Sequence, residues 1–124
     1  MSRAEHILFI DDDESIREFV NMALTDEGYQ VVTAPNGAAA LELLKQDHPT
    51  LILLDMRMPV MDGRAFLKAY QAMQGPHAPI IALTASRSGP DTLVPPEVSS
   101  FLAKPFDLNE LLDLIGQYMR ATNT

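Results

Sequence analysis

The chain has 124 residues, of which 47% are hydrophobic, and its 17 acidic and nine basic residues give a formal net charge of −8. This length predicts a single domain over residues 1–124, with enough apolar side chains for a core. The acidic balance argues against binding to nucleic acid or to anionic membranes, both of which require basic patches. The chain has no cysteine, which excludes disulfides, and no apolar leader or membrane-length run, so we expect a cytoplasmic protein.

Five short segments are typical of β-strands. Continuous apolar runs at residues 6–10, 51–54, 80–83 and 101–103 predict parallel strands that are buried on both faces. Residues 30–34 form a shorter run around Val31-Val32-Thr33, which predicts a fifth strand.

Amphipathic segments alternate with these strands. Apolar residues at helical spacing after Asp13 predict a helix that Gly28 ends, and Asn36 is expected to cap a second helix through about residue 46. Asp62 is expected to cap a third helix that ends before Gly75, and Asp107 begins a last helix with a capping-box pattern. The alternation predicts an α/β fold with a doubly wound parallel sheet.

Residues 86–99 are the exception to this alternation. The segment contains Pro90, Pro95 and Pro96, and each proline in a helix interior costs about 3 kcal/mol. We therefore expect a loop, or a short irregular turn, where the pattern calls for a fourth full helix.

Residues suited to phosphoryl chemistry follow four of the strands. Asp11-Asp12-Asp13 follows the first strand, and Asp55, Thr84 and Lys104 follow three others. The ligand crevice of a parallel sheet lies at the carboxyl ends of its strands, so these side chains should converge. Carboxylates, a hydroxyl and an ammonium together predict a metal-assisted phosphoryl site.

With these motifs in order, the chain resembles the receiver domains of two-component response regulators, the CheY-like superfamily. The resemblance rests on the acidic pair, on Leu54-Asp55-Met56-Arg57-Met58-Pro59 with Asp62-Gly63, on Leu83-Thr84-Ala85 and on Ala103-Lys104-Pro105-Phe106. It covers nearly the whole chain. It implies a flavodoxin-like sheet of five parallel strands in the order 2-1-3-4-5.

The resemblance implies that Asp55 is the phosphoacceptor, since a carboxylate can attack phosphorus to give an acyl phosphate. Asp11 and Asp12 would hold Mg²⁺ together with Asp55 and the backbone carbonyl of Arg57. Asp13 is better interpreted as part of the helix N-terminus than as a metal ligand.

The resemblance also assigns residues to the phosphoryl group and the switch. Thr84 would donate a hydrogen bond to a phosphoryl oxygen, Ala85 would leave room for that group, and Lys104 would pair with it. Phe101 is placed where the family has an aromatic side chain that turns inward when the threonine moves.

Three further positions complete the assignment. Pro105 would follow a cis peptide bond, which proline alone makes accessible. Arg57 and Ser86 flank the expected mouth of the pocket, where the family tunes the lifetime of the phosphoryl group.

The resemblance implies a phosphoacceptor rather than an enzyme. We expect it to stand alone, because the chain ends a few residues after the last helix. Its donor would be a sensor histidine kinase or a histidine phosphotransfer protein, and its output would act through an unknown downstream protein. Two alternatives are a Mg²⁺-dependent phosphohydrolase with an Asp nucleophile and a flavodoxin-like cofactor binder. A phosphohydrolase needs a general acid and a cap over its substrate, while three carboxylates after the first strand would repel a flavin phosphate.

Overall fold

The computed structural model describes residues 5–57, 61–84, 97–104 and 106–122. Its five strands are β1 (Ile7–Ile10), β2 (Val31–Ala34), β3 (Leu51–Asp55), β4 (Ile80–Thr84) and β5 (Ser100–Ala103). All neighbouring strands are parallel, and the sheet has the order β2-β1-β3-β4-β5. The predicted fold class and strand order are therefore confirmed.

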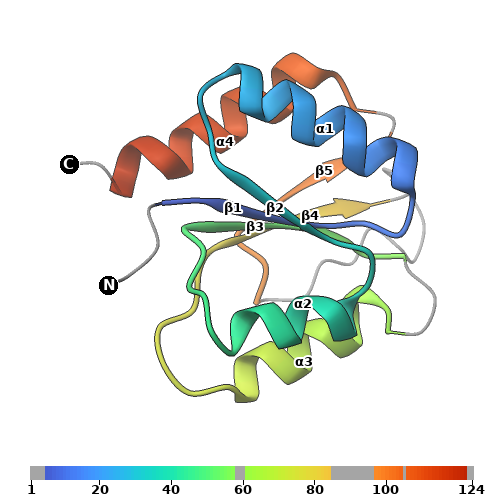
Figure 1. Cartoon of the computed structure of the whole chain (residues 1–124), viewed down its shortest axis with the longest axis vertical. Coiled ribbons are helices and arrows are strands. Elements are labelled where there is room, and N and C mark those ends of the chain that lie inside the picture. Colours follow the sequence, from blue (N-terminus) through green and yellow to red (C-terminus); the bar gives the residue numbers. More distant parts are fainter. Residues whose placement is uncertain (1–4, 58–60, 85–96, 105, 123–124) are drawn as a thin grey trace.

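Four helices in the described part of the chain cover the two faces of the sheet. They are α1 (Glu14–Asp26), α2 (Gly37–Leu44), α3 (Gly63–Ala72) and α4 (Leu108–Thr122). Figure 1 shows α1 and α4 on one face and α2 and α3 on the other. This three-layer arrangement follows from parallel strands, whose crossover connections place helices on both faces.

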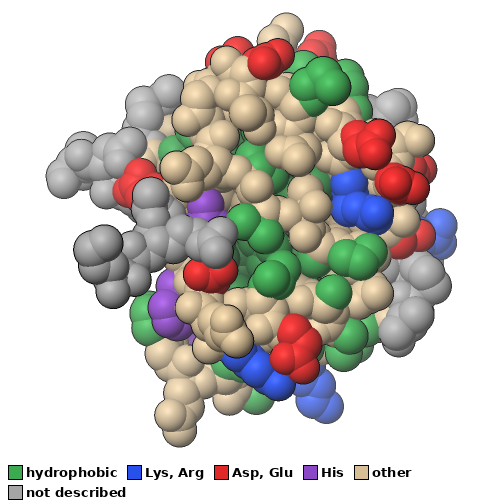
Figure 2. All heavy atoms as spheres, viewed as in Figure 1, with side chains coloured by type: hydrophobic (Ala, Val, Ile, Leu, Met, Phe, Trp, Pro, Cys, Tyr) green, Lys and Arg blue, Asp and Glu red, His purple; other side chains and the backbone are tan. Residues whose placement is uncertain are grey.

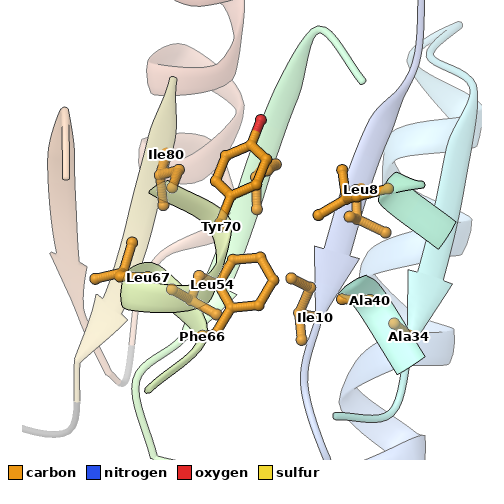
Figure 3. Packing of buried hydrophobic residues seen from close by; sticks show 11 residues of the cluster. Leu8, Ile10, Ala34, Ala40, Leu54, Phe66, Leu67, Tyr70 and Ile80 are labelled. Carbon is orange, nitrogen blue, oxygen red and sulfur yellow. The ribbon is translucent and has the colours of Figure 1, made fainter. Parts of the chain in front are cut away.

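The continuous apolar runs of β1, β3 and β4 are explained by two separate cores. Successive strand residues point to opposite faces, so one strand contributes to both. On the α2 and α3 side, the strand residues are Leu8, Ile10, Ile52, Leu54 and Ile80, packed against Phe66, Leu67 and Tyr70 (Figure 3). On the α1 and α4 side, they are Ile7, Phe9, Leu51, Leu53, Ile81 and Leu83, packed against Val20, Leu24, Leu111 and Ile115. The run at residues 101–103 was expected to be buried on both faces as well, and this prediction is wrong, because β5 is an edge strand on which Phe101 is exposed.

The predicted caps set where the helices begin. The side-chain oxygens of Asp13, Asn36 and Asp62 accept hydrogen bonds from the backbone N–H groups of Ile16, Ala39 and Ala65. Each bond satisfies an N–H that has no partner within the helix. At the end of α1, Gly28 has φ 95°, a conformation that favours glycine, and the helix stops there as expected.

The expected loop at residues 86–99 is described only in its last part. Residues 86–96 lie outside the described residues. Glu97, Val98 and Ser99 belong to no helix or strand, and the Ser99 N–H donates to the Ile80 carbonyl at 2.8 Å on the way into β5.

The described surface matches the acidic composition. On the face in Figure 2, acidic side chains are scattered over the surface and apolar side chains gather near the middle. None of the helices described is long and apolar enough to span a membrane.

Candidate functional site

The sheet register brings the predicted residues to one edge. Ile10 of β1 is level with Leu54 of β3, so Asp11 and Asp55 are the next residues along two adjacent strands. Thr84 is level with Ala103, which places Lys104 directly beyond the end of β5. The Lys104 N–H donates to the Thr84 carbonyl at 2.7 Å and fixes the start of the loop after β5.

Three carboxylates gather at this edge. Asp11, Asp12 and Asp55 each offer an oxygen, and these oxygens lie within 4.8 Å of one another. Asp11 and Asp55 are buried, whereas Asp12 is exposed. These three residues, called the acidic cluster from here on, could hold a metal ion.

Lys104 is the cation of the acidic cluster. Its Nζ lies 3.4 Å from Asp11 Oδ2 and 3.5 Å from Asp55 Oδ2. Three carboxylates and one ammonium have a formal sum of −2. Such a set of hard oxygen ligands suits a divalent cation such as Mg²⁺, so the residues fit the metal that the resemblance implies.

Asp55 has an unusual protonation equilibrium. The pKa of its carboxyl is raised to about 6, because burial, with a smaller contribution from the charge of Asp11, outweighs the lowering effects of the Arg57 N–H and of Lys104. The Arg57 N–H donates to Asp55 Oδ1 at 3.1 Å. At neutral pH the carboxylate is still mostly ionised, which is the form that a nucleophile requires.

The raised pKa predicts a pH-dependent stability in metal-free solution. The folded state binds the proton of Asp55 more tightly than the unfolded state, so stability falls as pH rises from about 4 to about 6. At high pH the folded state is destabilised by the buried charge of Asp55, and Asp55→Asn removes that charge. A shift of about two pKa units corresponds to roughly 3 kcal/mol of folding free energy at most. We expect urea unfolding with chelator to show the variant about 1–3 kcal/mol more stable at pH 8, and little changed at pH 4. An equal gain at both pH values would contradict this cause.

Thr84 lies at the same edge with an unpaired hydroxyl. Its side chain is buried, and Oγ1 has no hydrogen-bond partner among the described residues. An unsatisfied buried hydroxyl is unfavourable by about 1–3 kcal/mol. Within the described ranges, this hydroxyl therefore keeps a hydrogen-bond donor that no acceptor uses.

Thr84→Val tests this interpretation of the hydroxyl. We expect the unphosphorylated variant to be as stable as the wild type or up to about 1 kcal/mol more stable, because Val keeps the shape and removes an unpaired polar group. Tyr70→Phe is the matched control, since the Tyr70 hydroxyl accepts the Ala78 N–H at 2.8 Å and its loss should cost about 1 kcal/mol. Urea unfolding measures both. A clear loss of stability in Thr84→Val would show that the hydroxyl has a partner in solution.

The other predicted residues differ in how far the structure describes them. Phe101 lies on β5 and is 52% exposed, and its movement stays a prediction. Arg57 is exposed beside Asp55, and its metal and lifetime roles also stay predictions. Ala85, Ser86 and Pro105 lie outside the described residues.

Two contacts in the site were not predicted from the sequence. The Asp13 N–H donates to Asp11 Oδ1 at 2.9 Å, and Arg17 Nη1 donates to the Asp11 backbone carbonyl at 2.7 Å. Every residue carries a backbone carbonyl, so no sequence motif could have predicted that Arg17 donates to the carbonyl of Asp11.

Comparison with known proteins agrees with the geometry. The model of the response regulator receiver domain family matches residues 7–116. The chain belongs to this family. Receiver domains are signalling modules of two-component systems, so this chain is such a module.

Curated relatives include complete receiver-sized proteins and longer regulators. The chain is 35% identical over 117 residues to sporulation initiation phosphotransferase F of Bacillus subtilis, covering 93% of this receiver domain and 94% of that protein. It is 40% identical over 112 residues to the transcriptional regulatory protein GlrR of Escherichia coli, covering 89% of this chain. The match spans only 25% of GlrR, and the same share of the transcriptional regulatory protein QseF.

Solved receiver structures have the same fold. A CheY-like receiver domain protein from Methanospirillum hungatei superimposes with a TM-score of 0.83 at 28% identity, with 98% of both chains covered. The response regulator TrrA from Thermotoga maritima, solved in complex with Mg(2+)-BeF, gives a TM-score of 0.80 at 30% identity, with 92% of this chain and 98% of that chain covered.

Proposed function

We propose that this receiver domain accepts a phosphoryl group on Asp55 from the phosphohistidine of a sensor histidine kinase or a histidine phosphotransfer protein, with Mg²⁺ as cofactor. The observation that carries the proposal is the acidic cluster with Lys104 beside Asp11 and Asp55, at the carboxyl edge of the sheet. Membership of the receiver family supports it.

In the proposed transfer, an oxygen of the Asp55 carboxylate attacks phosphorus and forms a P–O bond while the P–N bond of the donor breaks. The imidazole leaves and takes a proton from solvent. The product is an acyl phosphate. Because Asp55 is only slightly exposed at the end of β3, the attacking oxygen is held in a fixed position.

Neighbouring residues would control the charge that accumulates. Asp11, Asp12, Asp55 and the Arg57 carbonyl would hold Mg²⁺, which when bound offsets the repulsion between the phosphoryl oxygens and the carboxylates. Without an opposing charge, each like-charge pair at ~4 Å costs roughly 4 kcal/mol at an effective dielectric of 20. Lys104 would turn from the carboxylates to the phosphoryl group.

The switch would begin at Thr84. A phosphoryl oxygen would accept a hydrogen bond from the buried hydroxyl, which has no partner in the part of the chain that the structure describes, and moving Thr84 would open space next to β5 for Phe101. An inward turn of an exposed Phe101 would change the surface that a downstream protein meets.

The proposal is tested by incubating the protein with acetyl phosphate, with and without Mg²⁺, and measuring its intact mass. We expect one phosphoryl group per chain, stable in acid and labile in alkali, and formed only with the metal. Repeated turnover of an external phosphate ester, such as p-nitrophenyl phosphate, would instead favour the phosphohydrolase. No increase in intact mass after incubation with acetyl phosphate and Mg²⁺ would overturn the proposal.

A further inference from the structure

Arg17 makes an unusual connection between α1 and the end of β1. Its side chain is half-buried, and Nη1 donates to the backbone carbonyl of Asp11 at 2.7 Å, across six positions in the sequence. A hydrogen bond from a charged donor at this distance is about twice as strong as one between neutral groups.

The acceptor in this contact belongs to the peptide group that joins Asp11 to Asp12. The peptide unit is planar, so holding its oxygen also sets the direction in which the chain enters Asp12. The contact therefore acts on the residue that follows Asp11.

The two acidic residues depend on this contact to different extents. The Asp11 carboxylate is held on both oxygens, by the Asp13 N–H at 2.9 Å and by Lys104 at 3.4 Å. The Asp12 carboxylate is exposed, and within the described ranges no hydrogen bond or ion pair fixes it. Among the described residues, its place in the acidic cluster is therefore set by the course of the backbone.

We propose that Arg17 is a positioning residue for the acidic cluster, which keeps the Asp12 carboxylate within reach of a divalent cation by holding the Asp11–Asp12 peptide group. The inference rests on the proposed function, because it concerns the same metal site. Arg17 itself contacts neither metal nor phosphoryl group in this role.

The test is calorimetric titration of the protein with MgCl₂ at constant, moderate ionic strength. Arg17→Met, which keeps the length of the side chain and removes its donors, should weaken Mg²⁺ binding about tenfold, or about 1.4 kcal/mol. Arg17→Lys keeps one charged donor and should bind within about threefold of the wild type. Lys68→Met is the matched control, because it removes one exposed positive charge from α3, and it should bind like the wild type.

A double-mutant cycle separates positioning from a general structural effect. If Arg17 acts through Asp12, then Arg17→Met should cause no further loss of Mg²⁺ affinity in an Asp12→Asn background. The cycle is repeated with Arg17→Gln, whose side chain is an uncharged donor. The result then does not depend on whether Arg17→Met folds correctly. In metal-free protein, the amide NMR signal of Asp12 should shift in Arg17→Met while signals of β3 stay in place.

The outcomes are distinguishable. Unchanged Mg²⁺ affinity in Arg17→Met, an equal loss in Lys68→Met, or additive losses in the cycle would each overturn the positioning role. Each would leave the proposed function standing if wild-type protein still binds Mg²⁺ and is phosphorylated. Failure of the wild type to bind Mg²⁺ would overturn both.

Discussion

Asp55→Asn should abolish phosphorylation by acetyl phosphate in the presence of Mg²⁺, with labelling reduced at least 100-fold. An amide lacks the anionic oxygen that attacks phosphorus, and it also removes one ligand of the acidic cluster. Asparagine has nearly the same shape, and Lys104 keeps Asp11 as a partner, so the fold should be retained. Intact mass measures the labelling.

Asp26→Asn is the control for this result. It makes the same substitution at an exposed position at the end of α1, and its labelling should equal that of the wild type. Mass increase of Asp55→Asn to the wild-type level would mean that another residue accepts the phosphoryl group, and the assignment of Asp55 would be wrong.

Gly63→Ala should be the most damaging of the small substitutions near the site. Gly63 is the first residue of α3, and its N–H donates to the Met56 carbonyl at 3.1 Å. A Cβ added at Gly63 would lie 2.7 Å from Met56 Cα, so the backbone next to Asp55 would have to move. We expect a loss of about 1–3 kcal/mol in urea unfolding, together with slower phosphorylation.

Gly37→Ala provides a matched control at the first residue of α2. There the added Cβ would meet the side chain of Met61, at 2.8 Å from Sδ, and a methionine side chain can turn aside. We expect a change of less than about 1 kcal/mol and normal labelling. Equal damage from the two substitutions would show that the close approach at Met56 is not the cause.

The sequence was sufficient to predict the sheet and most of the site. The apolar runs of β1, β3 and β4 predicted buried parallel strands because each of these strands contributes side chains to two cores, as Ile7 and Leu8 do on opposite faces. The same prediction for residues 101–103 was wrong, because β5 lies at the edge of the sheet and Phe101 is exposed. The four strand-end motifs predicted the acidic cluster and Lys104, although Lys104 is 93 positions from Asp11. Parallel topology accounts for this success, since it gathers strand ends from distant parts of the sequence.

The contacts that the sequence did not reveal depend on the backbone or on exact packing. Arg17 binds a carbonyl, which every residue carries, and the close approach of Gly63 to Met56 requires coordinates. That Thr84 Oγ1 has no hydrogen-bond partner among the described residues is likewise visible only in the folded structure. The proline-rich segment remains a prediction over residues 86–96, which lie outside the described residues.

The position of β3 in the sheet has a consequence for how firmly Asp55 is held. β3 lies between β1 and β4, and all five of its residues are buried. Buried central strands are generally the last parts of a protein to open. Asp55 lies on such a strand, whereas Asp12 and Lys104 lie on connections outside the strands. In the proposed transfer, the Asp55 carboxylate would therefore keep its position, and the incoming phosphoryl group would have to adapt to the geometry of Asp55.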